Sequence, residues 1–122
     1  MKQNLHPPAT PLEMLSLFLP AGLLDYFDLV NHVSQETCFI FFLEEKPSIP
    51  QEHSHLHLHS KGFFPEIEVQ DFPVRGKAVY LRIKRRRWED PETGQTYSRD
   101  WNLVASGTRI TAEFGAFFKS VT

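Results

Sequence analysis

Seven of the thirteen basic residues of this 122-residue chain lie in one stretch, RGKAVYLRIKRRRW at residues 75–88, which contains no acid. They are Arg75, Lys77, Arg82, Lys84, Arg85, Arg86 and Arg87. Such side chains neutralise the phosphates of nucleic acids, and arginine can also donate two hydrogen bonds to one guanine. Short basic motifs are weak evidence alone, because a solvated edge strand whose charges discourage aggregation has the same composition.

The first half of this stretch alternates between apolar and polar side chains, as a half-buried β-strand does. Val79, Leu81 and Ile83 share one face, and polar or basic residues occupy the other. Beyond Ile83 both faces become basic through residues 85–87, before Trp88 closes the run. A sheet cannot bury such a segment on both sides, so we expect its end to project into water or onto an anionic partner.

Four histidines form a second pattern that could do chemistry, HSHLHLH at residues 53–59. On a strand, His53, His55, His57 and His59 would form one row, with neighbours about 6.5–7 Å apart. Two imidazoles could share a transition metal, but four in a line cannot close a tetrahedral site without ligands from elsewhere. We therefore favour the solvent face of an amphipathic strand, and a histidine-based metal site is the alternative.

No group of residues has the pattern of a catalytic site. Cys38 is the sole cysteine, which excludes an internal disulfide and a zinc site of several thiolates. No basic neighbour supports its activation as a nucleophile. The carboxylate pairs Glu66/Glu68 and Glu89/Asp90 lack an accompanying nucleophile or cofactor loop. We expect a buried inert thiol, no cofactor and no enzymatic activity.

The formal net charge of -2 hides an uneven distribution. Residues 1–60 carry two basic and seven acidic residues, a balance of -5, and residues 61–122 carry eleven basic and eight acidic residues, a balance of +3. The positive half can therefore serve an anionic partner. No apolar run approaches the roughly 20 residues that span a bilayer, and the N-terminus lacks the apolar core of a signal peptide. We expect a cytoplasmic protein without membrane contact.

The elements that would position these residues predict an α+β fold in a single domain, residues 1–122, because 41% hydrophobic content with eleven Phe suffices for one core. We expect an antiparallel sheet or meander of about five strands, with a short N-terminal helix and a C-terminal helix. Residues 1–10 form a loose arm, residues 12–45 a helix plus a hairpin, and residues 53–121 the basic meander and the last helix.

Local signals predict where the elements begin and end. Thr10 is a helix N-cap, Pro11 takes the first helical position, Glu13 follows three residues after the cap, and Pro20 ends the helix. Its leucine spacing indicates packing against the sheet rather than a groove for a partner. CFIFFL at residues 38–43 is apolar on both faces, which predicts a central strand. The other predicted strands lie at residues 26–33, 67–70, 77–88 and 96–104, and the last helix begins at Thr108 or Thr111.

The hairpin that contains the basic stretch has acidic residues on its other strand. We expect Glu66 and Glu68 to lie across from Arg82 and Lys84, where the opposite charges stabilise the register modestly. Residues 85–87 lie beyond these acids and lack obvious partners. The functional prediction therefore concentrates on this end of the strand.

Four phrases in the second half of the chain carry a resemblance. They are SKGF at residues 60–63, VQDFPVRGK at 69–77, YLRIKRRRW at 80–88 and RDWNLVASGTR at 99–109. With them the chain resembles the N-terminal region of a group of bacterial insertion-sequence transposases, most clearly over residues 60–118 and loosely over 12–121. In that group the region can be encoded apart from the catalytic part.

The resemblance implies a part in DNA transposition without the chemistry itself. The family's catalysis uses three acidic residues that bind divalent metal in a ribonuclease-H-like domain, and no part of this chain has the length or pattern of that fold. Related transposases carry a cysteine-based zinc ribbon in the corresponding region. Cys38 alone cannot supply one, so zinc is not carried over, and a core rich in Phe and Trp takes its place.

Three hypotheses follow. The first is a non-catalytic transposase region that binds the DNA of the element ends in a salt-sensitive manner, the catalytic transposase subunit, or both. Its expected DNA contacts are Lys77, Arg82, Lys84, Arg85, Arg86, Arg87 and Arg109. The second is a protein-interaction module without DNA contact, whose basic strand pairs with an acidic surface. Residues 1–60 of another copy could supply that surface, and the chain would then form a homo-oligomer. The third is a small metal-binding domain that uses the histidine row.

Overall fold

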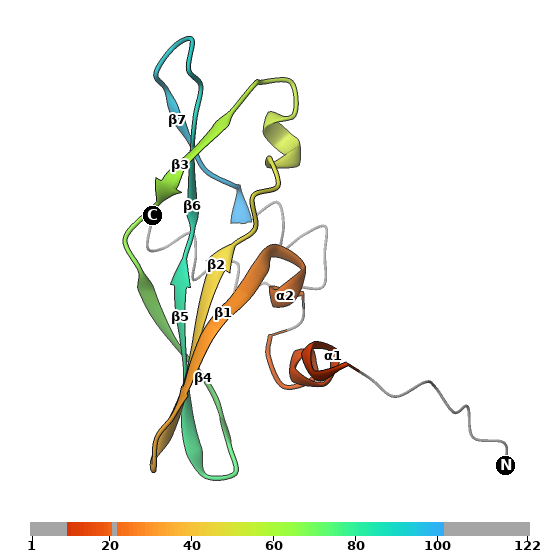
Figure 1. Cartoon of the computed structure of the whole chain (residues 1–122), viewed down its shortest axis with the longest axis vertical. Coiled ribbons are helices and arrows are strands. Elements are labelled where there is room, and N and C mark those ends of the chain that lie inside the picture. Colours follow the sequence, from red (N-terminus) through yellow and green to blue (C-terminus); the bar gives the residue numbers. More distant parts are fainter. Residues whose placement is uncertain (1–9, 21, 102–122) are drawn as a thin grey trace, which may run out of the picture.

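The computed structural model of the chain describes residues 10–20 and 22–101. Their elements are α1 (Pro11–Ser16), α2 (Leu23–Tyr26), β1 (Phe27–Ser34), β2 (Cys38–Glu45), the 3-10 turn η1 (Gln51–His53), β3 (His59–Phe63), β4 (Ile67–Val74), β5 (Lys77–Lys84), β6 (Arg86–Glu89) and β7 (Thr96–Tyr97). The strands follow the long axis of the molecule, and α1 and α2 lie beside β1 and β2 (Figure 1). The predicted arm at residues 1–9, residues 102–104 of the predicted fifth strand and the predicted C-terminal helix lie outside the described residues.

The described strands form two sheets rather than one sheet of about five strands. The larger has the order β1-β2-β5-β4, and the smaller has the order β3-β6-β7. Every neighbouring pair is antiparallel except β2 and β5, which are parallel. The predicted α+β class is thus confirmed, but the sheet is not a simple meander. The chain between β2 and β5 passes through η1, β3 and β4, and a crossover of this length lets the second strand return in the same direction.

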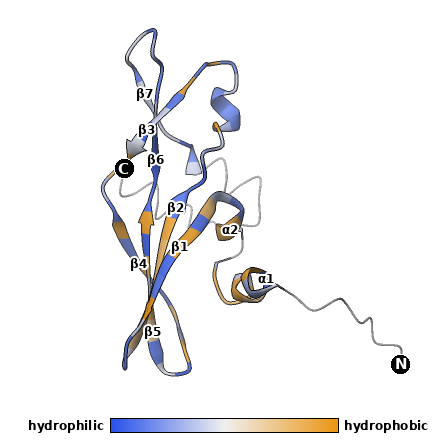
Figure 2. Cartoon of the chain, viewed as in Figure 1, coloured by the Kyte–Doolittle hydropathy of each residue, from blue (hydrophilic) through white to orange (hydrophobic). Residues whose placement is uncertain are grey.

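The core lies in the larger sheet, on the face toward the two helices. β2 lies between β1 and β5, as its apolar sequence predicts. β5 alternates as expected, with its apolar residues buried and Tyr80, Arg82 and Lys84 half-buried on the other face. Figure 2 shows apolar residues concentrated in this sheet and the helices, whereas η1 and β6 are mainly hydrophilic. The core cluster consists of Leu19, Leu23, Phe27, Leu43, Val79, Leu81, Ile83 and Trp101.

The hairpin between β4 and β5 ends in a turn with two residues of positive φ. Arg75 has a φ of 51° and Gly76 a φ of 76°. Val74 pairs with Lys77 across the turn, so two residues connect the strands. Positive φ at both central positions is the requirement of a type I′ turn, whose twist matches that of the strands. The hairpin therefore holds an arginine in a conformation that arginine rarely adopts.

The N-terminal helix begins where its sequence predicts. The Thr10 hydroxyl oxygen accepts a hydrogen bond from the Glu13 amide at 3.1 Å, and Pro11 occupies the first turn. α1 has only six residues and none of them is buried, so its attachment depends on half-buried Leu15 and on Leu19 beyond its end. A second short helix, α2, begins at Leu23, three residues after Pro20. No helix in residues 10–20 and 22–101 is long and apolar enough to cross a membrane.

The predicted strand at residues 77–88 is wrong in one respect, because it is two strands. The ladder between β2 and β5 ends at the pair Glu44 and Lys84. The Arg86 backbone N–H then donates a hydrogen bond to a side-chain oxygen of Glu45, the last residue of β2, at 3.1 Å. Arg85 belongs to neither strand, and β6 continues in the smaller sheet. The predicted strand at residues 96–104 is also too long, since its extended pairing covers only Thr96–Tyr97 in the described part.

Candidate nucleic-acid interface

The predicted contacts Arg82 and Lys84 have carboxylate neighbours on the open face of the larger sheet. Arg82 Nε donates to Glu68 Oε2 at 3.0 Å, as the predicted register requires. Lys84 Nζ lies 4.0 Å from Glu44 Oε2, on β2. Continued by one residue, the same register places Glu66 across from Lys84, but the ladder ends at Ile67 and Ile83 and the ion pair of Lys84 is with Glu44. Both cations are about 40% exposed, and each has a carboxylate neighbour that competes with a phosphate.

Lys77 lies at the opposite end of β5 from the three arginines. Its Nζ is 4.2 Å from the centroid of the Phe39 ring and donates to the Ser34 hydroxyl at 3.4 Å. No carboxylate in the described residues forms an ion pair with it. The other predicted outer contact, Arg109, lies outside the described residues. The length of β5 therefore separates Lys77 from the three arginines.

Arg85 is buried, which overturns its prediction as a DNA contact. Its side chain is 4% exposed and lies with its guanidinium carbon 5.6 Å from the centroid of Phe64. Its Nε and Nη1 have no hydrogen-bond partner among the described residues. Burial lowers the pKa of Arg85, and the nearby Glu45 carboxylate opposes that effect. A guanidinium so enclosed cannot reach the groove of a duplex.

Arg86, another predicted DNA contact, is half-buried and makes hydrogen bonds within the fold. Its Nε and Nη2 donate to the Glu45 carbonyl oxygen at 3.0 and 2.9 Å, and its Nη1 donates to the Ser60 hydroxyl at 2.6 Å. The guanidinium carbon also lies 4.7 Å from the centroid of Phe63. The side chain thus connects the end of β2 to β3 through three hydrogen bonds within the fold.

Glu45 is the centre of these contacts, and sequence reasoning missed it. Its side chain is 1% exposed. One carboxylate oxygen accepts from the Arg86 amide at 3.1 Å, and the other accepts from Arg99 Nε at 3.3 Å. Burial raises the pKa of Glu45, and the Arg86 amide and Arg99 partly offset this rise. Arg99 also donates to the Ser48 carbonyl oxygen at 2.7 Å. No sequence motif marks this ion pair, whose members lie 54 positions apart.

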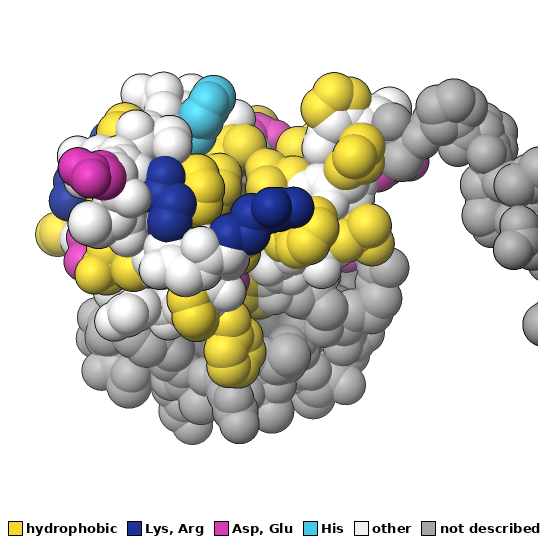
Figure 3. All heavy atoms as spheres, turned by 90° about the horizontal axis from the view of Figure 1, so that it is seen from below, with side chains coloured by type: hydrophobic (Ala, Val, Ile, Leu, Met, Phe, Trp, Pro, Cys, Tyr) yellow, Lys and Arg dark blue, Asp and Glu magenta, His cyan; other side chains and the backbone are white. Residues whose placement is uncertain are grey.

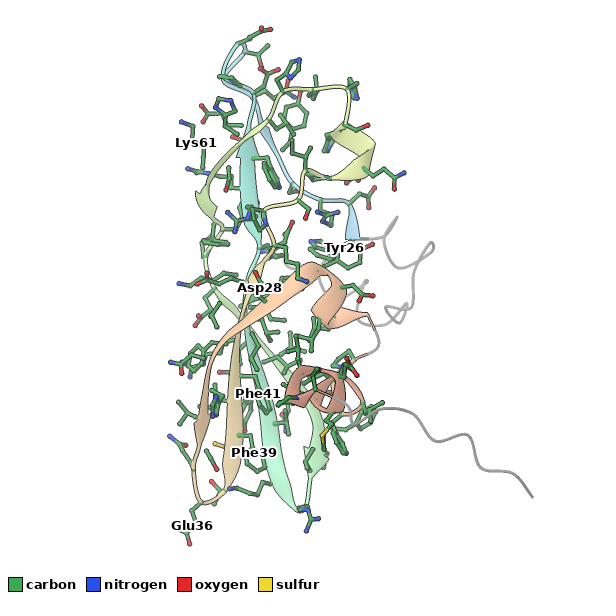
Figure 4. All side chains as sticks on the ribbon, turned by 45° about the vertical axis from the view of Figure 1, so that its right-hand side comes forward. Tyr26, Asp28, Glu36, Phe39, Phe41 and Lys61 are labelled. Atoms are coloured by element: carbon green, nitrogen blue, oxygen red, sulfur yellow. The ribbon has the colours of Figure 1, made fainter. Side chains whose placement is uncertain are left out.

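Arg87 is the one member of the arginine triplet that faces solvent. It is exposed on β6, and its Nη2 donates to the Lys61 carbonyl oxygen at 3.3 Å. Lys61 is also exposed, on β3, and no described carboxylate forms an ion pair with either side chain. Figure 4 labels Lys61 on the side of the smaller sheet opposite η1. We call Lys61 and Arg87 the β3–β6 cation pair.

The histidines do not form the row that a strand would create. His53 belongs to η1, His55 and His57 lie in the loop that follows, and only His59 is on a strand. The His53 ring lies 4.8 Å from that of Tyr97. Within residues 10–20 and 22–101, no three His, Cys, Asp or Glu side chains are grouped as metal ligands would be. The row prediction is wrong because the chain turns at residues 51–56 before β3 begins.

Cys38 is buried at the start of β2, as the sequence predicts. Its Sγ donates to the Gln35 side-chain oxygen at 3.2 Å. This contact closes the turn between β1 and β2, and the Gln35 backbone N–H also donates to the Cys38 carbonyl oxygen at 2.8 Å.

Comparisons with protein-family models, with curated proteins and with solved structures find no match to this chain.

Proposed function

We propose that this chain is a non-catalytic N-terminal region of a transposase that contacts DNA, the catalytic transposase subunit, or both during transposition. The proposal is supported by the resemblance of residues 60–118 to such regions. The observation that carries the DNA contact is the β3–β6 cation pair, which is exposed and free of ion pairs within the described residues. Arginine and lysine placed in this way release counterions when they meet phosphates.

Four of the seven cations predicted to contact DNA have surroundings that favour a role within the fold. Arg85 and Arg86 are engaged in the fold, and Arg82 and Lys84 have acidic neighbours. With a formal charge of -2 on the whole chain, long-range attraction to DNA is weak. The binding that we expect is therefore local, modest and strongly dependent on salt.

The experiment is a fluorescence-anisotropy titration with duplexes taken from the two ends of the DNA element that encodes the chain. The variant Lys61→Ala/Arg87→Ala should bind more weakly than wild type. Its salt dependence, the slope of log K against log salt concentration, should become shallower by about 1.8, because each lost phosphate contact contributes about 0.9.

The matched control is Arg82→Ala/Lys84→Ala, which removes the same formal charge from the other sheet. Because these cations are already paired, we expect its salt slope to stay close to that of wild type. Equal weakening by both double variants would mean that only net charge matters, and the β3–β6 pair would be rejected as a site. A triple change of residues 85–87 is unsuitable here, since it would truncate the buried Arg85 side chain and remove the hydrogen bonds that Arg86 makes within the fold.

A protein contact is the second candidate function, and a separate observation favours it. Large apolar side chains in and beside α1 face solvent. They are Leu12, Met14, Leu17 and Phe18, with exposed fractions of 53%, 54%, 79% and 67%. The predicted packing of the leucine face is confirmed for Leu15 and Leu19, which lie at the core cluster, but not for Leu12, which is exposed. Exposed apolar side chains that lie together commonly mark the contact with another molecule.

A further inference from the structure

A hollow lies between the α1 segment and the adjoining face of the larger sheet. Its volume is about 140 Å³. We call it the α1 groove, and its walls are formed by Leu15, Phe18 and Leu19 on one side and by Phe39, Phe41 and the β4–β5 hairpin on the other. Figure 4 labels Phe39 and Phe41 beside α1. The groove lies on the larger sheet, whereas the β3–β6 cation pair lies on the smaller one.

The size of the α1 groove limits what it can hold. An engineered apolar cavity of about 150 Å³ binds one benzene molecule. The α1 groove is similar in volume and is lined by apolar side chains, so it fits one aromatic or large aliphatic side chain. Phe18, one of the wall residues, is 67% exposed, so the groove is open to a side chain that enters from solvent.

The rim of the groove is cationic. Lys77 Nζ lies 4.2 Å from the ring centroid of Phe39, which is part of the wall. Arg75 follows Val74, another wall residue, in the hairpin turn. Neither cation forms an ion pair with a described carboxylate. Figure 3 shows cationic side chains beside hydrophobic ones at this end of the molecule.

The conformation of Arg75 is a second observation about this rim. Its φ of 51° lies in the left-handed region, which Gly or Asn occupies at lower cost than arginine. A backbone that is strained for the residue it carries is a reason to look for a role of the side chain. Arg75 is exposed in the turn between the wall residue Val74 and Lys77, so it carries a second positive charge at this end of the hairpin.

We propose that the α1 groove docks a segment of a partner protein that inserts one large apolar side chain and places an acidic residue against Lys77 and Arg75. Charge complementarity decides between possible segments, because a basic segment would meet two unpaired cations. Asp71 lies across from Val79 in the β4–β5 ladder, so the β4 side of the groove carries a negative charge and the Lys77 end a positive one. The acidic residue of the partner should therefore face the Lys77 end and not the outer edge of β4.

The experiment is a selection from a phage library of random 12-residue peptides, with the whole chain as bait. We expect enriched peptides to share one Phe, Leu, Ile, Met or Trp, with Asp or Glu a few positions away. Synthetic copies of these peptides should bind in solution and protect the amides of α1 from hydrogen exchange, since the inserted side chain bridges α1 and the sheet.

Three variant baits make the test specific. Phe18→Ser removes part of the wall and should weaken the selected peptides by about tenfold or more. Phe72→Ser is the matched control, because Phe72 is 84% exposed on β4 and is not part of the groove wall, so it should leave binding unchanged. Lys77→Glu should reverse the charge preference and enrich Lys or Arg in place of Asp or Glu.

Several results would overturn the proposal. Selection of no peptide above background is one, and equal binding by Phe18→Ser and wild type is another. A charge preference that Lys77→Glu leaves unchanged would remove the rim from the recognition. Self-association of the chain in sedimentation that Phe18→Ser abolishes would make a second copy the occupant. Because Phe18 and Lys77 are not buried, thermal unfolding of both variants should match wild type and confirm that the baits are folded.

Discussion

At the scale of single residues, three successive arginines have three different environments. Arg85 is buried with two unpartnered N–H groups in the described part of the chain, Arg86 donates three side-chain hydrogen bonds, and Arg87 faces solvent. Composition cannot distinguish them, because the difference arises from where the strand ends and from which arginine meets Glu45, some 41 positions earlier in the chain. Tertiary contacts decide which of the three can act at the surface.

These environments predict that the most buried arginine of the three is not the most stabilising. Arg86→Met should lower the free energy of unfolding by about 2–4 kcal/mol, because it removes charged hydrogen bonds at a joint between strands. Arg85→Met should change it by about 1 kcal/mol at most in either direction, since methionine fills the space without the cost of desolvating a guanidinium. Urea denaturation followed by circular dichroism measures both.

Arg87→Met is the control for this pair, and we expect a change within about 0.5 kcal/mol, as for most exposed positions. If Arg85→Met is as damaging as Arg86→Met, the buried guanidinium is held by strong contacts, and its assignment as an unpartnered group is wrong.

At the scale of elements, the β4–β5 hairpin carries the clearest local strain. Arg75→Asn should raise the free energy of unfolding by about 1 kcal/mol, because asparagine tolerates positive φ better than arginine. Gly76→Ala is the opposite change. A Cβ at Gly76 would meet no atom within 4 Å, so its cost of about 1 kcal/mol comes from the positive φ alone. Thermal and urea unfolding of the two variants should therefore shift in opposite directions.

The same hairpin separates the stability of the turn from the role of the rim. Arg75→Asn should stabilise the protein and also weaken the peptides selected by the α1 groove, because it removes one of the two rim charges. A variant that becomes more stable and binds as well as wild type would show that Arg75 takes no part in docking.

Local rules predict much of the fold but little of its assembly. Thr10, Pro11 and Glu13 mark the helix start correctly, and CFIFFL marks the central strand. These signals succeed because hydrogen-bond capping and side-chain alternation act over a few residues. The parallel pairing of β2 with β5 could not be predicted in this way, since it depends on a crossover of more than thirty residues between Glu45 and Lys77.

The candidate site shows the same limit. Sequence reasoning predicted the register of the β4–β5 hairpin, in which Glu68 pairs with Arg82. It did not predict the surroundings of Arg85 and Arg86, because the acid that binds Arg86 comes from the end of another strand. The predicted packing of the α1 leucines holds for Leu15 and Leu19, whereas Leu12 is exposed at the start of this short helix.

At the scale of the whole molecule, one buried carboxylate connects the two sheets. Glu45 is the last residue of β2 in the larger sheet. Its side chain accepts one hydrogen bond from the backbone N–H of Arg86 in the smaller sheet and another from Arg99, in the segment after β7. Three cationic side chains, those of Arg85, Arg86 and Arg99, act on this group. The stability of the junction should therefore depend on the protonation of Glu45.

The direction of this dependence follows from the pKa. Burial raises the pKa of Glu45 in the folded protein above its ordinary value of 4.5, so the folded state binds this proton more tightly than the unfolded state. The associated stabilisation is fully present below pH 4.5 and is lost as the pH rises through the folded pKa. Glu45→Gln keeps an oxygen acceptor for the Arg86 amide but cannot titrate. We therefore expect the free energy of unfolding of wild type, minus that of Glu45→Gln, to fall as the pH rises from 4.5 toward neutrality.

Urea denaturation at a series of pH values measures this difference directly, and subtraction removes the titration of every other group that the two proteins share. The slope of the difference therefore reports the carboxyl group of Glu45, the one titratable group that the substitution removes. A difference that stays constant with pH would mean that Glu45 has the same pKa in both states. A difference that rises with pH would show that its arginine partners outweigh its burial, and the junction would then be held by charge rather than weakened by it.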